Sequence, residues 1–598
     1  MFQDFSVSAR PENGPPRLEA LRRIMEAEGV DGFLIPRADV HQGEYVAPCD
    51  DRLAWLTGFT GSAGFCAALR DQAGVFVDGR YRVQVKHQVD LGSFTPVHWP
   101  ETGLAEWLTA RMTKDQTLAI DPWLHTVKEG LALATALEDK GVDLRETDNL
   151  LDRIWEDRPA PPTEPVMVYP DALAGRSAED KRTSLAADLR KAGQSAAVLT
   201  LPDSLNWLLN IRGADIPRNP IAQCLGILHD DGTVTLFIDA KKLEGIAPLE
   251  GVTIAEPAGF ATALSELTGK VAVDYGTAPL AVYRALRAAG ATPVDTRDPC
   301  ALPKAAKTDA EITATRTAHL RDASAVVKFL AWLDSAPKDS LSEIDVVTAL
   351  EGFRRETNAL RDISFETICG SGPNGAIMHY RVTKETNRPL ADDTLLLVDS
   401  GGQYLDGTTD ITRTMALREP GEEERTAYTQ VLQGLIAISR ARFPKGVAGA
   451  HLDALARAPL WAAGRDFDHG TGHGVGVYLS VHEGPQRLSR VSDLPLEPGM
   501  ILSNEPGYYL EGRFGIRLEN LIVVQPAPAL PGGDPERTQY AFETLTFVPF
   551  DRRLIDVTIL APAERDWLDA YHGEVLAKVG PQLDTAPLAW LTAACAPL

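Results

Sequence analysis

Three segments in the second half of the chain hold residues of the types that bind metal ions. The first, Val398–Thr414, reads VDSG…TTDITRT; the second, Asp468–Pro485, has three histidines among five glycines; the third, Asn504–Asn520, reads NEPGYY…GIRLEN. Together they contain four carboxylates and one imidazole suited to a pair of divalent ions, namely Asp399, Asp410, His473, Glu505 and Glu519. This set of ligands is typical of a metal-dependent hydrolase.

The two aspartates are predicted to lie opposite each other. Asp399 ends the apolar segment TLLLVDSG, a turn follows at Asp406-Gly407, and TTDITRTM then alternates with a period of two. This pattern predicts a β-hairpin that brings Asp399 close to Asp410. A single aspartate at a strand end is usually a turn former. Two aspartates that face each other across a hairpin repel unless a cation lies between them, which favours a metal site.

The two glutamates belong to apolar segments further along the chain. Glu505 closes MILSNE and precedes the turn signal Pro506-Gly507. Glu519 lies in GIRLENLIVV, a strand pattern in which Arg517 shares its face, so an ion pair between Arg517 and Glu519 is an alternative to metal binding. The two explanations are compatible, because an arginine can orient a carboxylate that binds a metal.

The histidine-rich segment does not have the character of a helix. His469 and His473 have the spacing of a helical zinc site, but Gly-Thr-Gly lies between them. Each glycine in a helix interior costs about 1 kcal/mol relative to alanine, so a loop or a distorted strand is expected. No glutamate follows His469, which excludes the HExxH type of metalloprotease. Glycines here would let a peptide or a metal approach the backbone closely.

The charges of the candidate ligands match two divalent ions, since each of the four carboxylates carries one negative charge. Ligation dominated by oxygen favours a hard ion such as Mn²⁺, with Co²⁺ and Zn²⁺ as alternatives. A water that bridges two such ions would ionise near neutral pH and attack a carbonyl carbon. We therefore expect hydrolysis by a metal-activated hydroxide.

Two segments in the first half of the chain resemble each other, Val30–Tyr81 and Ala196–Lys242. Each has an apolar strand, a Trp-Leu pair and strands around a glycine turn, and each follows an amphipathic helix, which predicts a duplicated α/β domain. Beyond them, helices followed by strands and glycine-rich turns predict an α+β catalytic domain. The predicted domains are residues 1–158, 159–305 and 306–545, with a C-terminal extension, residues 546–598, that packs on the catalytic domain or on a second subunit.

Composition limits the partners and the location of the protein. A chain of 598 residues with 44% hydrophobic and 24% charged residues is expected to be a soluble protein of several domains. Its net charge of −24 argues against nucleic acid and anionic membranes as partners. No basic N-terminal region precedes an apolar run and no stretch reaches roughly 18 apolar residues, so neither a secretory signal nor a membrane span is expected. The six cysteines have no CxxC spacing, as in a reduced cytoplasmic protein.

Two further segments complete a family pattern, NGAIMHY at Asn374–Tyr380 and FVPFDRRLIDV at Phe547–Val557. With them, the sequence resembles the aminopeptidase P family, pita-bread-fold metallopeptidases that remove an N-terminal residue preceding proline. The resemblance extends over nearly the whole chain, includes two creatinase-like N-terminal domains, and is strongest to the long three-domain cytosolic form. It implies an Xaa-Pro aminopeptidase, peptide substrates with proline in the second position, a cytoplasmic location and a homodimer.

The resemblance also implies a role for each candidate ligand. Asp399 would bind one ion through both oxygens, and His473 would bind the other. Asp410 and Glu519 would bridge the two ions. Glu505 would be both a ligand and the general base for the bridging water.

Five other residues receive roles from the same resemblance. His482 and His379 would hydrogen-bond the scissile carbonyl and its developing oxyanion. His469 would line the subsite that receives the proline. Tyr509 and Arg517 would lie around the metal-bound water.

Other functions of the same fold are alternatives to this interpretation. A prolidase that acts only on dipeptides is the nearest one, although its relatives normally carry a single N-terminal domain. A methionine aminopeptidase would share the ligands but lack the long N-terminal extension. A catalytically inactive pita-bread binding module and a metal-free creatinase are both disfavoured, because all five ligands are present.

Overall fold

The computed structural model describes all 598 residues, which form two compact units. Unit 1 consists of Met1–Val7, Ala172–Gly175 and Leu302–Leu598, and unit 2 consists of Ser8–Asp171 and Arg176–Ala301. All candidate ligands belong to unit 1. The domain boundaries expected from the sequence remain predictions.

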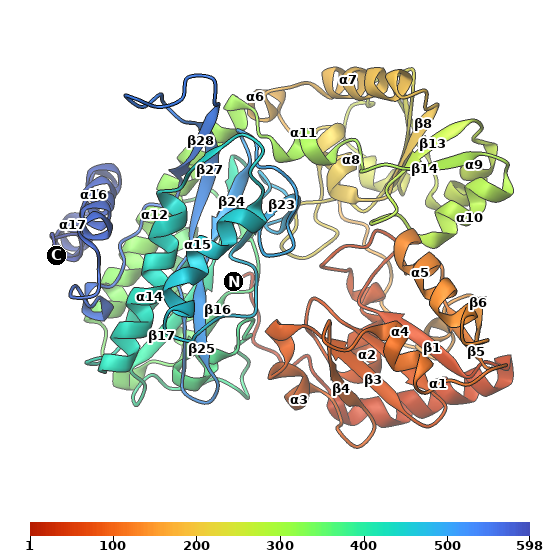
Figure 1. Cartoon of the computed structure of the whole chain (residues 1–598), viewed down its shortest axis with the longest axis horizontal. Coiled ribbons are helices and arrows are strands. Elements are labelled where there is room, and N and C mark those ends of the chain that lie inside the picture. The colour runs from red at the N-terminus through yellow and green to blue at the C-terminus, as the bar shows by residue number, and fades with distance from the viewer. The chain divides into compact units, whose positions relative to one another are not determined.

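Unit 2 contains two six-stranded sheets of the same topology (Figure 1). The first has the order β4 (Thr95–His98), β3 (Ala73–Val77), β2 (Phe65–Leu69), β1 (Gly32–Pro36), β5 (Thr117–Ile120) and β6 (Asp143–Glu146). The second has the order β12 (Val252–Ala255), β11 (Val234–Phe237), β10 (Leu225–His229), β8 (Ala196–Leu199), β13 (Lys270–Val273) and β14 (Thr292–Asp295). In each sheet the corresponding strand pairs run in the same relative direction, which confirms the predicted duplication.

A helix precedes each sheet, as the amphipathic patterns predict. Helix α1 (Gly14–Glu28) precedes the first and α7 (Ala178–Lys191) the second. The two copies pack together through α5 (Val127–Glu138) and α10 (Leu280–Ala288), where a Cβ at Gly130 would lie 2.7 Å from the Leu280 side chain. The absence of a side chain at Gly130 therefore leaves room for Leu280 between the two helices.

Unit 1 combines helices with several sheets, which confirms the α+β character expected of the catalytic domain (Figure 1). Its longer helices are α12 (Asp309–Ser335), α13 (Glu343–Arg355), α14 (Glu422–Ser439), α15 (Gly449–Trp461), α16 (Pro562–Val579) and α17 (Thr585–Ala594). The largest sheet has the order β21 (Arg442–Pro444), β28 (Gln539–Thr544), β27 (Asn520–Pro526), β24 (Ile501–Asn504), β22 (Gly472–Gly474) and β23 (Glu483–Leu488). The smaller sheets are β16 (Ile368–Ser371), β17 (Leu395–Ser400) and β20 (Ile411–Ala416); β15 (Leu360–Ile363), β18 (Gly402–Tyr404) and β19 (Gly407–Thr408); and β25 (Gly507–Leu510) with β26 (Phe514–Arg517).

The predicted pairing of the two aspartate segments is confirmed, although the connection is more complex than a hairpin. Strands β17 and β20 are antiparallel, with Asp399 opposite Thr412 and Asp410 one residue before β20. The chain between them forms its own hairpin, β18 and β19, which pairs with β15 in a separate sheet. Strand β20 is buried on both faces, so its period-two pattern does not mark a solvent-facing side.

The single strand expected through Glu519 is wrong. Strand β26 ends at Arg517 and β27 begins at Asn520, and the two belong to different sheets. Glu519 therefore lies where the chain crosses from the two-stranded sheet to the six-stranded one. A local pattern of apolar residues is continuous across such a crossing, because both flanking strands are buried.

The C-terminal tail packs on the core of unit 1, one of the two options that the sequence left open. Tyr571 of α16 and Leu591 of α17 belong to the hydrophobic core that also contains α12, α13, α14 and β17. The N-terminal heptapeptide packs in the same unit, since the Phe2 N–H donates to the Glu351 carboxylate at 2.8 and 3.0 Å.

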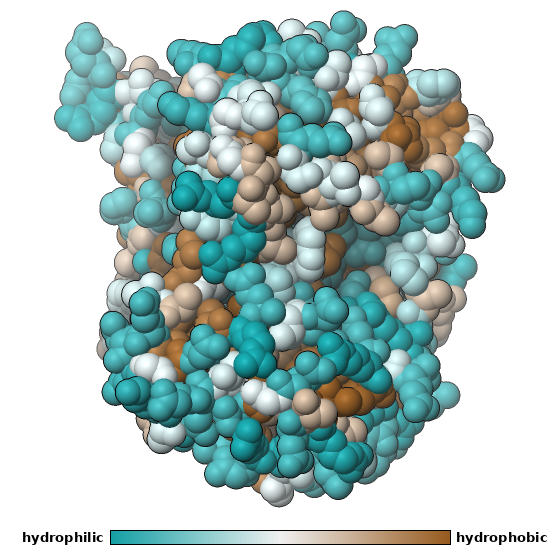
Figure 2. Space-filling view, turned by 90° about the vertical axis from the view of Figure 1, so that its right-hand side faces the viewer, coloured by the Kyte–Doolittle hydropathy of each residue, from teal (hydrophilic) through white to brown (hydrophobic).

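The surface seen in Figure 2 is mainly hydrophilic and the cysteines are buried, as the composition and the cysteine spacing predict. On the face drawn in Figure 2 hydrophilic side chains predominate, and the apolar ones lie in separate groups. All six cysteines are buried and none forms a disulfide, namely Cys49, Cys66, Cys224, Cys300, Cys369 and Cys595. No helix has both the length and the apolar character needed to cross a bilayer.

Candidate metal centre

The five candidate ligands converge at the ends of strands in unit 1. Asp399 lies near the end of β17, and Asp410 directly before β20. His473 is the middle residue of β22, Glu505 follows β24, and Glu519 lies at the crossing between β26 and β27. Strands from three sheets thus bring together residues that are up to 120 positions apart in the sequence.

Their donor atoms lie close enough to share metal ions. Three overlapping groups each have one donor atom per residue within 4.8 Å of the others: Asp399, Asp410 and Glu519; His473, Glu505 and Glu519; and Asp410, His473 and His482. The Nε2 atom of His473 is 3.5 Å from Asp410 Oδ2 and 3.4 Å from Glu505 Oε1. His482, expected only as a hydrogen-bond donor, is therefore also within reach of a metal.

The electrostatics of the carboxylates calls for positive charge. Burial raises the pKa of Asp410 well above its usual range, and the nearby charges of Asp399 and Glu505 raise it further. Burial likewise raises the pKa of Glu519 and of Glu505. The Oδ1 atoms of Asp399 and Asp410 are buried and accept no hydrogen bond, an arrangement that is costly for an anion unless a cation binds it. Four carboxylates and an imidazole in this state fit two divalent ions.

The tautomer of His473 is determined by its backbone partner. Its Nδ1 lies 2.8 Å from the Gly474 carbonyl oxygen, so Nδ1 carries the proton and Nε2 presents a lone pair to the carboxylates. The His473 N–H donates to Ser503 Oγ at 2.9 Å, and Ser503 Oγ donates to Glu505 Oε1 at 3.0 Å. Ser503 thus links two of the ligands, a role that nothing in the sequence indicated.

The glycines around His473 are required by close packing of the backbone. A Cβ at Gly472 would lie 1.9 Å from the Ser503 carbonyl oxygen, and one at Gly474 would lie 2.3 Å from that of Glu483. The register of β22 with β23 shifts between His473 and Gly474. The expectation of a loop or a distorted strand is confirmed.

Arg517 pairs with Asp399 rather than with Glu519. Its Nη2 and Nε atoms lie 2.6 and 3.2 Å from Asp399 Oδ2. Glu519 instead accepts a hydrogen bond from Thr412 Oγ1 at 2.9 Å. The ion pair that the sequence left open is wrong, because the strand break after Arg517 separates the two side chains.

Tyr509 and His469 extend this network. Arg517 Nη1 donates to the Tyr509 hydroxyl at 2.6 Å. His469 Nδ1 faces the Gly470 carbonyl oxygen at 2.8 Å and must carry a proton, so Nε2 accepts from the Tyr509 hydroxyl at 2.8 Å. Burial raises the pKa of Tyr509 to about 12, which keeps this donor protonated at neutral pH. Asp399, Arg517, Tyr509 and His469 therefore form one chain of contacts.

His379 is brought to the same region through its backbone. It follows the short helix η8 (Gly372–Ala376), and the carbonyl oxygen of its neighbour Met378 accepts from Arg517 Nη2 at 3.2 Å. The structure thus gathers all ten predicted site residues, nine through side-chain contacts and His379 through its neighbour.

A buried cluster of charged residues lies next to His482, and no sequence pattern indicates it. Lys304 Nζ lies 2.9 Å from Glu483 Oε2, and Lys307 Nζ contacts Glu483 Oε1. All three side chains are at most 3% exposed. The two lysines belong to a segment that reads as a domain boundary, and their partner lies more than 170 positions later, so only the fold reveals the cluster.

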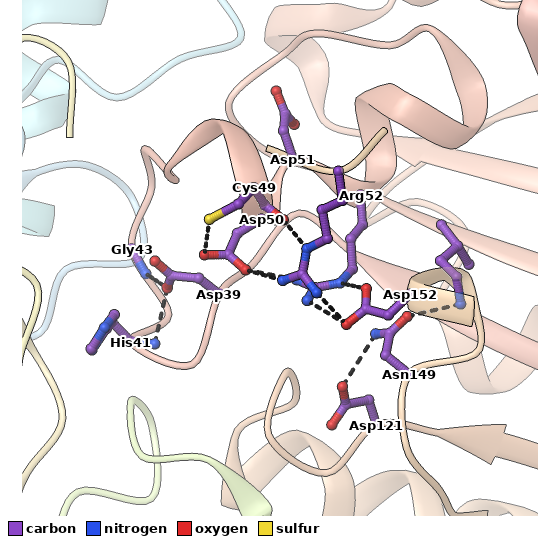
Figure 3. Close-up of polar contacts among 12 residues, drawn as sticks. Asp39, His41, Gly43, Cys49, Asp50, Asp51, Arg52, Asp121, Asn149 and Asp152 are labelled. Carbon is purple, nitrogen blue, oxygen red and sulfur yellow. Dashed lines mark hydrogen bonds and ion pairs between the residues drawn. The ribbon is translucent and has the colours of Figure 1, made fainter. Parts of the chain in front are cut away.

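The segment His41–Arg52 of unit 2 has its own polar network (Figure 3). Asp39 accepts from the backbone N–H groups of His41 and Gly43 at 2.9 and 3.2 Å. Arg52 contacts Asp152 with two nitrogens, at 2.8 and 3.0 Å, and Asp50 with a third at 3.0 Å. These contacts hold the segment within unit 2.

Comparison with known proteins identifies the regions of the chain. Residues 313–526 match the metallopeptidase family M24, and residues 538–598 match the C-terminal region of the same peptidases. Residues 17–154 and 157–311 each match the creatinase/prolidase N-terminal domain. The duplicated sheets of unit 2 are thus two domains of one family, and the ligand cluster lies in the peptidase region.

Relatives match over nearly the whole length. A probable Xaa-Pro aminopeptidase P of Aspergillus clavatus is 37% identical over 96% of this chain and 91% of its own. Aminopeptidase P2 of Arabidopsis thaliana is 37% identical over 95% and 86%. The crystal structure of an X-prolyl aminopeptidase from Caenorhabditis elegans, described as a cytosolic enzyme with a di-nuclear active site, covers 98% of this chain and 100% of its own at 32% identity with a TM-score of 0.92. The chain belongs to the Xaa-Pro aminopeptidase P family of M24 metallopeptidases.

Proposed function

We propose that this protein hydrolyses the peptide bond between an N-terminal residue and a proline in the second position, with two divalent metal ions, Mn²⁺ being the expected one. The observation that carries the proposal is the convergence of Asp399, Asp410, His473, Glu505 and Glu519 within metal-binding distance. The family and the full-length likeness to an X-prolyl aminopeptidase with a di-nuclear site support it.

The proposed ligands keep the roles implied by the resemblance. Asp399 would hold one ion and His473 the other, with Asp410 and Glu519 between them and Glu505 beside His473. When bound, the ions would ionise a shared water near neutral pH and so supply the nucleophile. Thr412 and Ser503 orient Glu519 and Glu505 through hydrogen bonds.

The remaining steps belong to side chains of the protein. Glu505 would accept the proton released during attack, a task that suits a buried carboxylate of raised pKa. His482 and His379 would donate to the scissile carbonyl as negative charge develops on its oxygen. The contacts of Arg517 would hold the Asp399 carboxylate and the Tyr509 hydroxyl in place beside the metal ions. His469 would line the proline subsite.

Proline in the second position places a special demand on the site. Its nitrogen carries no hydrogen and its ring fixes φ near −65°. A site that relies on an N–H of this residue therefore fails. The shape of the site and the two histidines that donate to the scissile carbonyl must hold the substrate instead. We propose that the protein works in the cytoplasm as a homodimer, as the resemblance implies. The C. elegans relative, described as a cytosolic enzyme, supports the proposed location.

A single assay tests the proposal. The protein is stripped of metal with a chelator and incubated with Arg-Pro-Pro and with the dipeptide Arg-Pro, with and without Mn²⁺. We expect release of arginine from Arg-Pro-Pro only after Mn²⁺ is restored. Cleavage confined to the dipeptide would identify a prolidase, and no cleavage by protein that holds two ions would refute the proposal.

A further inference from the structure

A buried carboxyl group outside the ligand set lies at the centre of a second polar network. Glu343, the first residue of α13, has no exposed surface. Its Oε1 atom accepts from the Ser371 N–H at 2.7 Å and from Asn374 Nδ2 at 3.0 Å. Its Oε2 atom accepts from the Tyr380 hydroxyl at 2.9 Å and from the Arg388 N–H at 3.0 Å. Four segments of unit 1 meet at this one side chain.

The network requires an acceptor at both oxygens of Glu343. The backbone N–H groups of Ser371 and Arg388 can only donate, and they approach different oxygens. A carboxylate satisfies both. A glutamine cannot, because its NH₂ group would face one of the two N–H groups. Burial raises the pKa of Glu343 to about 7, while the four donors act in the opposite direction.

The donors to Glu343 surround the segment that carries His379. Asn374 lies in η8, Tyr380 directly follows His379, and Asn374 Nδ2 also donates to the Tyr380 hydroxyl at 2.9 Å. On the other side of His379, the Met378 carbonyl oxygen accepts from Arg517. His379 is therefore held between an anchor on the Asp399–Arg517 pair and an anchor on Glu343.

The rest of the segment has little freedom to adjust. Gly372 has a φ of +49°, and a Cβ there would lie 2.3 Å from Asp393 Oδ1. A Cβ at Gly515 of β26 would lie 1.7 Å from the Gly375 carbonyl oxygen. The backbone before His379 is thus packed directly against its neighbours, and a displaced Tyr380 would move His379 with it.

We propose that Glu343, as a carboxylate, is a positioning residue for His379 and acts through Tyr380 and Asn374. It touches none of the candidate metal ligands, so it sets the placement of the histidine and not the binding of metal. Through the role of His379 this inference rests on the proposed function. A misplacement of about 1 Å at a catalytic group can lower turnover by roughly 100-fold.

The test is a double-mutant cycle on the metal-loaded, full-length protein at pH 8. Glu343→Gln, His379→Ala and the double variant are compared for kcat and KM on Arg-Pro-Pro, for bound metal and for thermal unfolding. Glu351→Gln is the matched control, since Glu351 is a buried glutamate of the same helix that contacts Phe2 and not the His379 segment.

We expect Glu343→Gln to lower kcat/KM by roughly 10- to 100-fold, mainly through kcat, with two ions still bound. In the His379→Ala background it should cost less than about 3-fold, because the histidine it positions is gone. Glu351→Gln should stay within about 2-fold of the natural protein. Three results would overturn the proposal. The first is a double variant whose loss of kcat/KM equals the product of the two single losses. The others are an unchanged kcat/KM for Glu343→Gln and an equal loss in Glu351→Gln.

Two further measurements keep the test decisive. If Glu343→Gln does not fold, Tyr380→Phe removes one donor from the network and should show the same non-additivity with His379→Ala. If the natural protein holds two ions but cleaves no Xaa-Pro peptide, the proposed function fails while the positioning remains testable by crystallography. Residues 374–380 of Glu343→Gln, or of Tyr380→Phe, that superpose on the natural protein would then refute the role of Glu343.

Discussion

Removal of the charge on Glu483 should destabilise unit 1 far more than removal of one of its lysine partners. Glu483 lies between Lys304 and Lys307, and all three side chains are buried. Glu483→Gln leaves two buried ammonium groups facing an amide. Breaking a buried ion pair by removing one partner costs about 3–5 kcal/mol. Lys304→Met leaves a neutral Lys307–Glu483 pair and should cost about 1 kcal/mol or less.

The size of the effect makes it easy to measure. Unit 1 has roughly 300 residues. With an unfolding entropy of about 2.1 cal/mol/K per residue, a loss of 3–5 kcal/mol lowers its Tm by about 5–8 K. Differential scanning calorimetry of the metal-free variants would show this shift for Glu483→Gln and about 2 K or less for Lys304→Met. Equal shifts in the two variants would show that packing and not charge decides, and would refute the reasoning.

Three further predictions concern the metal centre itself. Glu505→Gln should leave the fold intact and lower kcat to below roughly a tenth of normal, because it removes a ligand and the general base; a higher kcat would contradict both roles. Asp410→Asn should weaken Mn²⁺ binding by roughly 10-fold or more in a calorimetric titration, and unchanged affinity would exclude it as a bridging ligand. In metal-free protein the raised pKa values of Asp410, Glu505 and Glu519 contribute stability that is present below their unfolded pKa and lost as pH rises through the raised values. The increase in Tm on adding Mn²⁺ should therefore grow from pH 5 to pH 8, and a constant increase would contradict the assignment.

The sequence pattern was sufficient to predict the structure where residues close together in the chain determine it. The glycines around His473 predict a distorted strand because each one removes a side chain that the backbone packing cannot hold. The apolar run before Asp399 predicts strand β17, which pairs with the strand that begins directly after Asp410. In both cases the signal lies within about ten residues of the candidate ligand.

The features that the sequence did not reveal depend on partners far away in the chain. The apolar pattern continues across Arg517 and Glu519 although the chain changes sheets there, so the shared strand face that the pattern gave these two residues is wrong. Lys307 finds its partner at Glu483, and Glu343 collects donors from segments up to 45 residues later. No periodicity marks such contacts, because they arise only when separate strands and loops come together.

The central claim is that four carboxylates and His473 form one cage for two cations. Anomalous diffraction at the manganese edge, from a crystal soaked in Mn²⁺, tests it most directly. We predict two peaks, one within reach of Asp399, Asp410 and Glu519 and one within reach of His473, Glu505 and Glu519. A well-ordered crystal with no peak among these side chains would contradict the account.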